Sequence, residues 1–280
     1  DVADELPDSF IAQLRSALEE EKPGAVLLGE VWEDGTNKIA YGERRRYLLG
    51  RETHGLMNYP FRKAAMDWLL GGDAAAFRES MEALRENYPA PAFYSAMNFL
   101  GTHDTPRILT LLGGEPTPES KTDRAAARLT PEGYDLARRR LMLGALLLYA
   151  FPGSPTVFAG DEAGHQGYEA PLNRRTYPWG QEDETLVAWF RRLGRLRRER
   201  PSLQLGDITY PYARGGGLAV QRRAGEQVSL AAMNAGPEPL ELRLPWPRST
   251  ATDAMTGQQF LVPDGAVHLT LPGYGGVLLI

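Results

Sequence analysis

The sequence has 280 residues, of which 42% are hydrophobic and 24% are charged. This composition is typical of a folded globular protein and excludes a disordered chain. The 31 Lys and Arg residues stand against 36 Asp and Glu residues, and the net charge of −5 argues against nucleic acid or an anionic membrane as the main partner. The absence of cysteine excludes disulfides and thiolate catalysis. The length suits one large domain, or a medium domain and a small one.

Up to about residue 200 the sequence alternates helical and strand-like patterns, which predicts an α/β fold. Asp8 or Ser9 is expected to cap a first helix. Further helices are expected to start after Pro60 and near Asp73 and to cover about 134–150 and 182–200, with Pro201 ending the last one. Strands are expected over about 25–31, 55–59, 95–100 and 155–159. The first strand is mostly apolar, which is typical of a strand buried on both faces of a parallel sheet.

After Pro201 the helical period disappears and short strand patterns separated by Gly and Pro turns take over. The expected strands are 207–212, 218–223, 227–233, 239–244, 266–271 and 274–279. This pattern predicts a small antiparallel β-sandwich domain over 204–280, after an α/β part over 1–203.

The longest apolar run, 141–151, stops at a Pro-Gly-Ser-Pro sequence. A bilayer span needs about 20 apolar residues, so this run predicts a buried helix and no membrane partner is expected.

Acidic residues follow several of the expected strands, where parallel α/β folds place their active residues. They are Glu30 with Trp32 close behind it, Asp104 in a turn that also contains His103 and Arg107, and the pair Asp161 and Glu162. Strand-end carboxylates also cap helices or simply face water, so none of these positions defines a site alone.

Several segments, taken in order, resemble the α-amylase family of glycoside hydrolases (family 13). Leu28-Gly29-Glu30-Val31-Trp32 resembles the segment with the general acid/base, and 98–107 resembles the segment with the third catalytic carboxylate. The segment 158–164 resembles the one after the last barrel strand, and 55–60 and 173–179 are similar to stretches of the neopullulanase, cyclomaltodextrinase and amylopullulanase branch. The first residues, Asp1-Val2-Ala3, resemble the end of the fourth-strand segment, which contains the nucleophile.

This resemblance implies an α/β fold made of a partial TIM (β/α)8 barrel, about strands five to eight, followed by the β-sandwich domain. The first half of the barrel would then lie outside this sequence. No cofactor or metal is implied for this chain, and calcium, where the family binds it, would belong to the missing half. The sequence indicates no particular compartment.

The resemblance also implies roles for individual residues. Asp1 would be the nucleophile, Glu30 the general acid/base and Asp104 the third catalytic carboxylate. The residues implied to contact substrate are His103, Trp32, Arg107, Asn58 and Tyr59. For His103 the alternative is a structural side chain bonded within its own loop, and for the aromatic residues it is ordinary packing.

The implied function is retaining hydrolysis of α-glucosidic bonds in an α-glucan such as maltodextrin, cyclomaltodextrin, pullulan or starch. The alternatives are a glucanotransferase and a non-catalytic carbohydrate-binding or structural piece. Because half a barrel leaves two open sheet edges, the chain alone is expected to be inactive and to self-associate.

Overall fold

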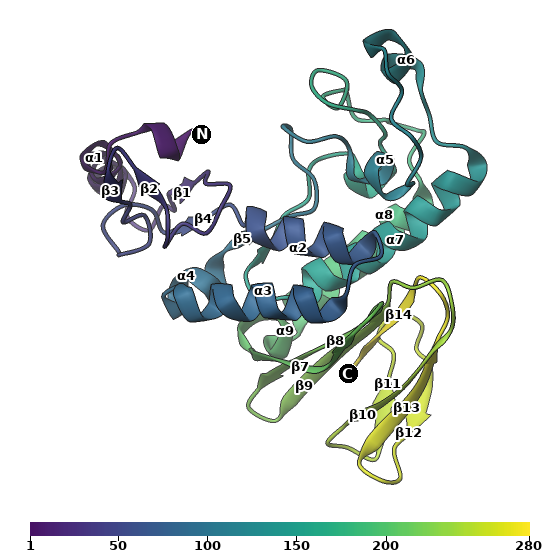
Figure 1. Cartoon of the computed structure of the whole chain (residues 1–280). Helices are drawn as coiled ribbons and strands as arrows, with labels where there is room; N and C mark the ends of the chain where they lie inside the picture. Colours follow the sequence, from purple (N-terminus) through teal and green to yellow (C-terminus); the bar gives the residue numbers. More distant parts are fainter.

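The computed structural model describes residues 1–280 as an α/β part followed by an all-β part (Figure 1). The α/β part contains η1 (Ala3–Glu5), α1 (Asp8–Glu21), β1 (Leu28–Gly29), β2 (Ile39–Ala40), β3 (Glu43–Arg44), β4 (Gly55–Leu56), α2 (Tyr59–Leu69), α3 (Ala74–Asn87), α4 (Ala90–Ser95), β5 (Met97–Asn98), α5 (Ile108–Leu112), α6 (Lys121–Ala126), α7 (Pro131–Ala150), β6 (Ser154–Pro155), η2 (Asp161–Ala163), α8 (Glu184–Glu199) and α9 (Pro201–Leu205). The all-β part contains β7 (Asp207–Arg214), β8 (Gly217–Ala224), β9 (Gln227–Asn234), β10 (Leu240–Pro245), β11 (Thr250–Thr252), β12 (Gln259–Leu261), β13 (Ala266–Leu271) and β14 (Gly275–Leu279).

The α/β part is organised around four short parallel strands. β1 pairs with β4, β5 pairs with β6, and a parallel bridge between Met57 and Met97 joins the two pairs. All four expected strands are therefore present, but each has only two residues, so their predicted bounds are wrong. Ser95 still belongs to α4, and β6 ends at Pro155, after which one more backbone hydrogen bond joins the N–H of Thr156 to the carbonyl of Asn98.

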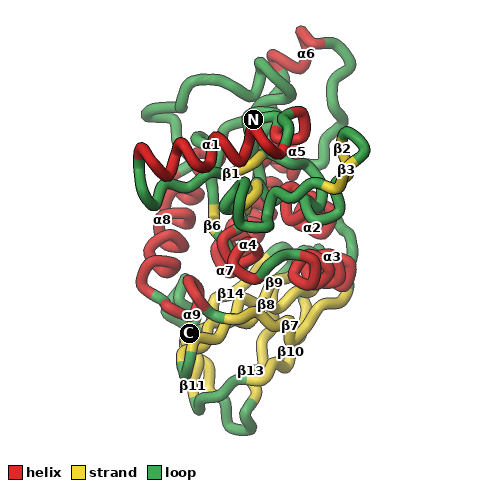
Figure 2. The backbone as a smooth tube through the Cα atoms, turned by 90° about the vertical axis from the view of Figure 1, so that its left-hand side faces the viewer, coloured by secondary structure: helices red, strands yellow, loops and turns green.

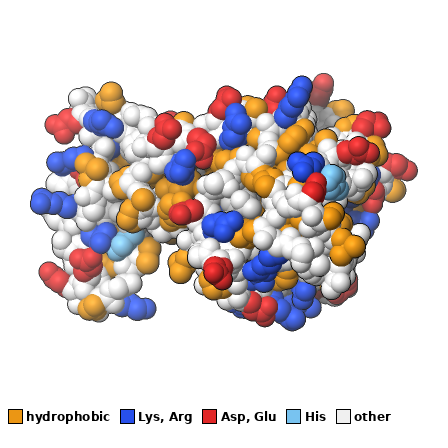
Figure 3. Space-filling view, turned by 90° about the horizontal axis from the view of Figure 1, so that it is seen from below, with side chains coloured by type: hydrophobic (Ala, Val, Ile, Leu, Met, Phe, Trp, Pro, Cys, Tyr) orange, Lys and Arg blue, Asp and Glu red, His pale blue; other side chains and the backbone are white.

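The first strand differs from its prediction in burial as well as in length. The side chains of Val26 and Leu28 are 64% and 40% exposed. The segment is therefore not covered on both faces, and β1 has β4 on one edge and no hydrogen-bonded neighbour on the other. On the face shown in Figure 3, the molecule has two unequal lobes, with hydrophobic side chains visible along the junction between them.

The first helix begins differently from its prediction. Pro7 occupies the N-cap of α1 and makes no side-chain cap bond, so neither Asp8 nor Ser9 caps this helix. The Asp8 carboxylate instead accepts a hydrogen bond of 2.6 Å from Nε of Arg45, which is almost fully buried. This ion pair fastens the start of α1 to the segment that follows β3.

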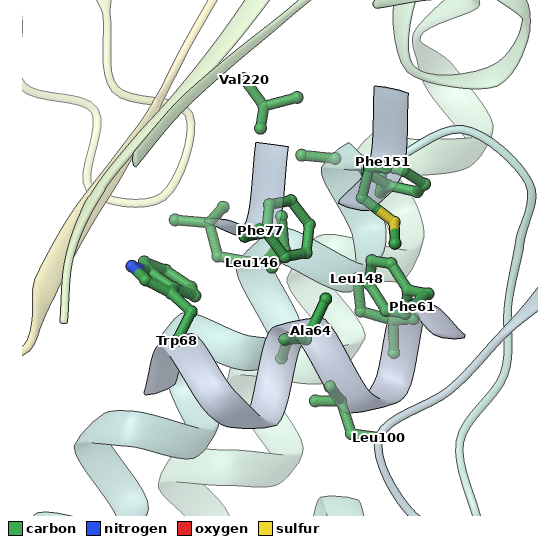
Figure 4. Packing of buried hydrophobic residues seen from close by; sticks show 14 of the residues in the cluster. Phe61, Ala64, Trp68, Phe77, Leu100, Leu146, Leu148, Phe151 and Val220 are labelled. Atoms are coloured by element: carbon green, nitrogen blue, oxygen red, sulfur yellow. The ribbon is translucent and has the colours of Figure 1, made fainter. Parts of the chain in front are cut away.

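The main core lies between α2, α3 and α7 and one face of the all-β part (Figure 4). Phe61 of α2 lies 4.9 Å from Phe151 and 6.1 Å from Phe77 of α3, measured between ring centroids. α3 begins at the expected place, because the Asp73 side chain accepts a hydrogen bond from the backbone N–H of Ala75. α7 is longer than predicted, since Thr130 caps it and Pro131 fits its first turn.

The helix predicted over 182–200 is confirmed as α8, which Asp183 caps. α8 ends just before Pro201, as predicted, and Pro201 also opens a second short helix, α9, which was not predicted. Proline is tolerated in the first turn of a helix because its missing N–H has no intrahelical partner there.

The all-β part adds a second layer beneath the helices (Figure 2). A four-stranded antiparallel sheet in the order β14-β9-β8-β7 presents Leu218 and Val220 to the helices and Ala219 to a separate core shared with β10 and β13. All six expected strands are present, whereas the short strands β11 and β12 were not predicted. The predicted domain boundary at 203/204 falls inside α9, and the helices and the sheet share one core across it.

Candidate active site

Glu30 directly follows β1, and two aromatic side chains hold it. Nε1 of Trp32 donates a hydrogen bond of 3.0 Å to Oε1 of Glu30, and the Tyr59 hydroxyl lies 3.4 Å from the same oxygen. The Trp32 and Tyr59 rings stack with centroids 4.2 Å apart and planes 14° from parallel. Because Trp32 is 49% exposed while Tyr59 is 5% exposed, the pair forms a wall that is open to solvent on one side.

Tyr59 also links Glu30 to the turn that contains Asp104. Burial raises the pKa of Tyr59 to about 12, and the negative charges of Glu30 and Asp104 add to this increase. The Tyr59 ring meets Phe99 edge-on at 4.9 Å, and Phe99 immediately follows β5. Glu30 and Asp104, which follow β1 and β5, therefore both lie near the hydroxyl of Tyr59, which follows β4.

The turn that follows β5 holds Asp104 between two cationic or potentially cationic groups. Nε2 of His103 lies 3.1 Å from Oδ2 of Asp104, and Arg174 donates to Oδ1 over 3.0 Å. Asn173 fixes the same turn by donating from Nδ2 to the carbonyls of His103 and Thr105 at 2.8 and 2.7 Å. The His103 contact agrees with the alternative of a bond within its own loop, although the imidazole stays 49% exposed.

Sequence reasoning did not assign Asn173 or Arg174 to the site. Both lie in the segment 173–179, which was singled out for its resemblance alone. They are about 70 residues from Asp104 along the chain, and no local pattern indicates which partner they reach.

Arg107 lies beneath this turn, where substrate cannot reach its side chain, which is 2% exposed. Its guanidinium donates from Nη1 to Oδ1 of Asp161 over 3.0 Å and to the Ala159 carbonyl over 2.8 Å, and from Nε to the Asn173 carbonyl over 2.7 Å. Burial raises the pKa of Asp161, and the positive charge of Arg107 opposes that increase. The direct substrate contact expected of Arg107 therefore does not fit its burial in this structure.

Asn58 is similarly occupied within the fold. Its residue is 3% exposed, its Oδ1 accepts from the backbone N–H of Phe61 and caps α2, and its Nδ2 donates to Oδ1 of Asn98 over 2.8 Å. The predicted substrate contact does not fit this burial either. Asn58 instead ties the start of α2 to β5, which fixes the neighbouring Tyr59.

Asp1 is exposed and makes no hydrogen bond or ion pair with Glu30 or Asp104. The segment after it runs beside β1, because a Cβ built on Gly29 would lie 3.6 Å from the Ala3 side chain. The predicted role of Asp1 as nucleophile stays a prediction.

No group of three or more His, Asp or Glu side chains is arranged to hold a metal ion. The calcium site expected outside this chain stays a prediction. None of the helices is both long enough and apolar enough to cross a membrane.

The family described as the alpha-amylase catalytic domain matches residues 5–204, and the chain belongs to this family. The chain is 33% identical over 308 residues to an amylopullulanase of Thermoanaerobacter thermohydrosulfuricus, covering all of this chain and 20% of that protein. It is 28% identical over 290 residues to a cyclomaltodextrinase of Geobacillus thermopakistaniensis, covering 99% of this chain and 43% of that protein.

Among solved structures, an α-amylase of Geobacillus thermoleovorans in complex with acarbose superposes with a TM-score of 0.80 at 22% identity, covering all of this chain and 58% of that one. This likeness establishes the alpha-amylase catalytic-domain fold. The chain thus spans between a fifth and somewhat over half of the length of these three proteins.

Proposed function

We propose that this chain provides the acid/base and the third carboxylate of a retaining enzyme that hydrolyses α-glucosidic bonds in α-glucans. The single observation that carries the proposal is the cluster of Glu30, Trp32, Tyr59 and Asp104 at the carboxyl ends of β1, β4 and β5. Family membership supports it, since the match covers this cluster. The named relatives include an amylopullulanase and a cyclomaltodextrinase, so an α-glucan is the proposed substrate class.

Each carboxylate has a distinct part in this chemistry. Glu30 protonates the glycosidic oxygen as the bond breaks and then takes a proton from the water that attacks the covalent intermediate. Asp104, held by His103 and Arg174, accepts hydrogen bonds from sugar hydroxyls and stabilises the positive charge of the oxocarbenium-like transition state. Asp1 is proposed as the nucleophile, which needs its carboxylate about 5–5.5 Å from that of Glu30.

The aromatic and supporting side chains divide into two groups. Trp32 is half-exposed and stacks on the buried Tyr59 ring, so it is the indole that offers an apolar face beside Glu30 to the C–H face of a glucose ring, with Tyr59 supporting it from behind. Arg107 and Asn58 act from below by holding the turn after β5 and the start of α2 in place.

We also propose the finer architecture. β1, β4, β5 and β6 are the fifth to eighth strands of a (β/α)8 barrel, and the all-β part is a β-sandwich domain that begins near residue 204. The parallel order β1-β4-β5-β6 supports the barrel assignment, and two facing antiparallel layers with their own core support the sandwich. In this proposal the first four strands of the barrel, and the residues that surround Asp1 in the site, belong to a longer protein.

The test compares Glu30→Gln with the parent in the longer protein that contains these residues, using maltotriose, cyclomaltodextrin and pullulan as substrates. We expect a loss of several orders of magnitude in kcat, because glutamine cannot exchange a proton. Glu33→Gln is the matched control, since Glu33 is a nearby exposed carboxylate that pairs with Lys38. Unchanged hydrolysis by Glu30→Gln would refute the proposal.

Two further readings of the same experiment address the alternatives. A parent that converts maltotriose into both longer and shorter maltodextrins, with no net gain of reducing ends, would be a glucanotransferase, because transfer also releases the leaving sugar but consumes no water. A parent that binds glucan but turns nothing over would be a non-catalytic binding protein. The 280-residue chain alone is expected to show no turnover, and measurable turnover would refute that expectation.

A further inference from the structure

A cavity lies apart from the Glu30 cluster, lined on one side by Arg128, which follows the end of α6. Its volume is about 490 Å³, within the size range of small-molecule sites. The lining residues that matter here are Arg128, His165, Gln166, Arg175, Tyr177 and Trp179. Neither Glu30 nor Asp104 lines it, and no Asp or Glu does, although the whole chain is net acidic.

The two arginines at one end of this cavity are close together. Nη2 of Arg175 donates to the Ala125 carbonyl over 2.7 Å, and Nη1 of Arg128 reaches the same oxygen at 3.5 Å. Nη1 of Arg128 also donates to the Ala127 carbonyl over 2.7 Å, so the two guanidinium groups lie close together and an anion between them would be bound by their other nitrogens. Neither arginine forms an ion pair within the chain, and only Nη1 of Arg128 and Nη2 of Arg175 make hydrogen bonds within it.

The electrostatics at this end favour an incoming negative charge. Desolvation and the positive charge of Arg175 lower the pKa of Arg128. Desolvation and the charges of Arg107, Arg175 and Arg128 lower the pKa of His165. Nδ1 of His165 is buried without a hydrogen-bond partner, and the Gln166 amide uses only its oxygen, which accepts from Leu129.

The other end of the cavity is aromatic. The Tyr177 and Trp179 rings lie 4.5 Å apart at 49°, and Trp179 is 80% exposed. Desolvation raises the pKa of Tyr177, and the negative charges of Glu162, Glu182 and Glu184 add to this increase. Negative charge therefore lies near the aromatic end of the cavity, and positive charge lies at the arginine end. At this end, the exposed indole of Trp179 suits the apolar C–H face of a sugar ring, whereas it offers nothing to bind a second anion.

We propose that this cavity binds a sugar phosphate, with the phosphate bridging Arg128 and Arg175 and the sugar ring lying against Trp179. Guanidinium groups match phosphate oxygens in planar, charge-assisted hydrogen bonds. The sugar ring adds contacts that inorganic phosphate lacks, and the phosphate adds contacts that glucose lacks. This site is independent of glucan hydrolysis and of the Glu30 cluster.

The test measures binding to the 280-residue chain by isothermal titration calorimetry, with glucose 6-phosphate, inorganic phosphate and glucose as separate probes. Glucose 6-phosphate is expected to bind more tightly than either of the others. Arg128→Gln and Arg175→Gln are each expected to raise its Kd by about tenfold or more, the worth of a lost charge-assisted hydrogen bond. Trp179→Ala is expected to weaken glucose 6-phosphate binding and leave phosphate binding unchanged.

Arg243→Gln is the matched control, because Arg243 is an exposed arginine of the all-β part that pairs with Asp264. Circular dichroism of each variant checks that the fold is retained. Three results would overturn the proposal: no saturable binding of glucose 6-phosphate, equal binding of glucose, or binding that survives both arginine variants. Phosphate bound as tightly as glucose 6-phosphate, with no effect of Trp179→Ala, would overturn the sugar contact.

Discussion

The indole nitrogen of Trp32 donates a hydrogen bond of 3.0 Å to Oε1 of Glu30, two residues before it in the chain. The same indole stacks on Tyr59, whose hydroxyl lies 3.4 Å from that oxygen. One carboxylate oxygen of Glu30 is thus oriented by two aromatic residues, while Oε2 has no hydrogen bond within the chain. This arrangement leaves one oxygen free for chemistry while the other fixes the direction of the side chain.

Trp32→Phe removes the hydrogen bond to Glu30 and keeps an aromatic ring on Tyr59. In the proposed longer enzyme we expect kcat to fall by about tenfold or more, because small errors in the placement of a catalytic group are costly. Steady-state kinetics on maltotriose measure the effect, and a KM within error of the parent would separate orientation from lost binding. A kcat equal to that of the parent would show that Glu30 does not depend on the indole.

Arg107→Met leaves the buried Asp161 carboxylate without its cation. We expect the free energy of unfolding to fall by about 3–5 kcal/mol, the usual cost of leaving one partner of a buried ion pair uncompensated. Asp161→Asn is expected to cost less, because Arg107 keeps the carbonyls of Ala159 and Asn173 as acceptors. Denaturant unfolding followed by circular dichroism gives both values.

The exposed pair of Arg78 and Glu79 provides the control for this prediction. Its atoms are 3.5 Å apart and both side chains are more than 40% exposed. Arg78→Met should therefore change the unfolding free energy by less than about 1 kcal/mol. Equal costs for Arg78→Met and Arg107→Met would contradict a supporting role for the Arg107 pair.

The sequence predicts the fold best where the pattern is long and local. The apolar period of α7 and the Asp73 cap of α3 are signals within one turn or one helix, and both helices are confirmed. The two-residue parallel strands were predicted too long, because apolar runs such as 25–31 do not indicate where pairing with a distant strand stops. The solvent exposure of Val26 likewise depends on which segments pack against it, and the residues around Val26 do not specify these.

For the candidate site, the sequence locates Glu30 and Asp104, but it does not separate contact residues from supports. Arg107 and Asn58 lie within the motifs that carry the resemblance, yet both are buried by partners far along the chain, Asp161 and Asn98. The roles of Asn173 and Arg174 depend on the folding of their loop onto the turn after β5. Such long-range contacts leave no periodic signature in one sequence.

Alkaline pH should destabilise the chain through its buried phenols. Burial raises the pKa of Tyr59, Tyr88 and Tyr134 to about 12 each, whereas phenols of the unfolded chain ionise near pH 10. The folded state therefore holds these protons more tightly, so the stability they contribute is complete below about pH 10 and is lost as the pH rises towards 12. Denaturant unfolding at a series of pH values measures this loss.

Tyr88→Phe removes one of these groups, and its unfolding free energy should depend less steeply on pH over that range. Ultraviolet absorbance of phenolate provides an independent check, because these three tyrosines, together with Tyr47 and Tyr210, whose pKa values are also raised by burial, should ionise late in the folded chain. If all 12 tyrosines titrated together near pH 10, the predicted protection of the buried phenols would be wrong.

The uncovered edge of β1 leads to the last prediction, which concerns self-association of the 280-residue chain. β1 has no hydrogen-bonded neighbour on one side, and the side chain of Val26, two residues before β1, is 64% exposed. An unpaired apolar strand edge favours pairing with another chain. Light scattering at micromolar concentrations should therefore detect species larger than the monomer.

Val26→Lys places a charge beside this edge at a position that is already solvated, so it should shift the chain towards the monomer without loss of helical circular dichroism. Leu261→Lys is the matched control, because it changes an exposed apolar residue of β12, away from β1. Association weakened by Val26→Lys and not by Leu261→Lys would assign the contact to the β1 edge. A parent chain that stays monomeric over the whole concentration range would refute the prediction, since the edge would then be tolerated in water.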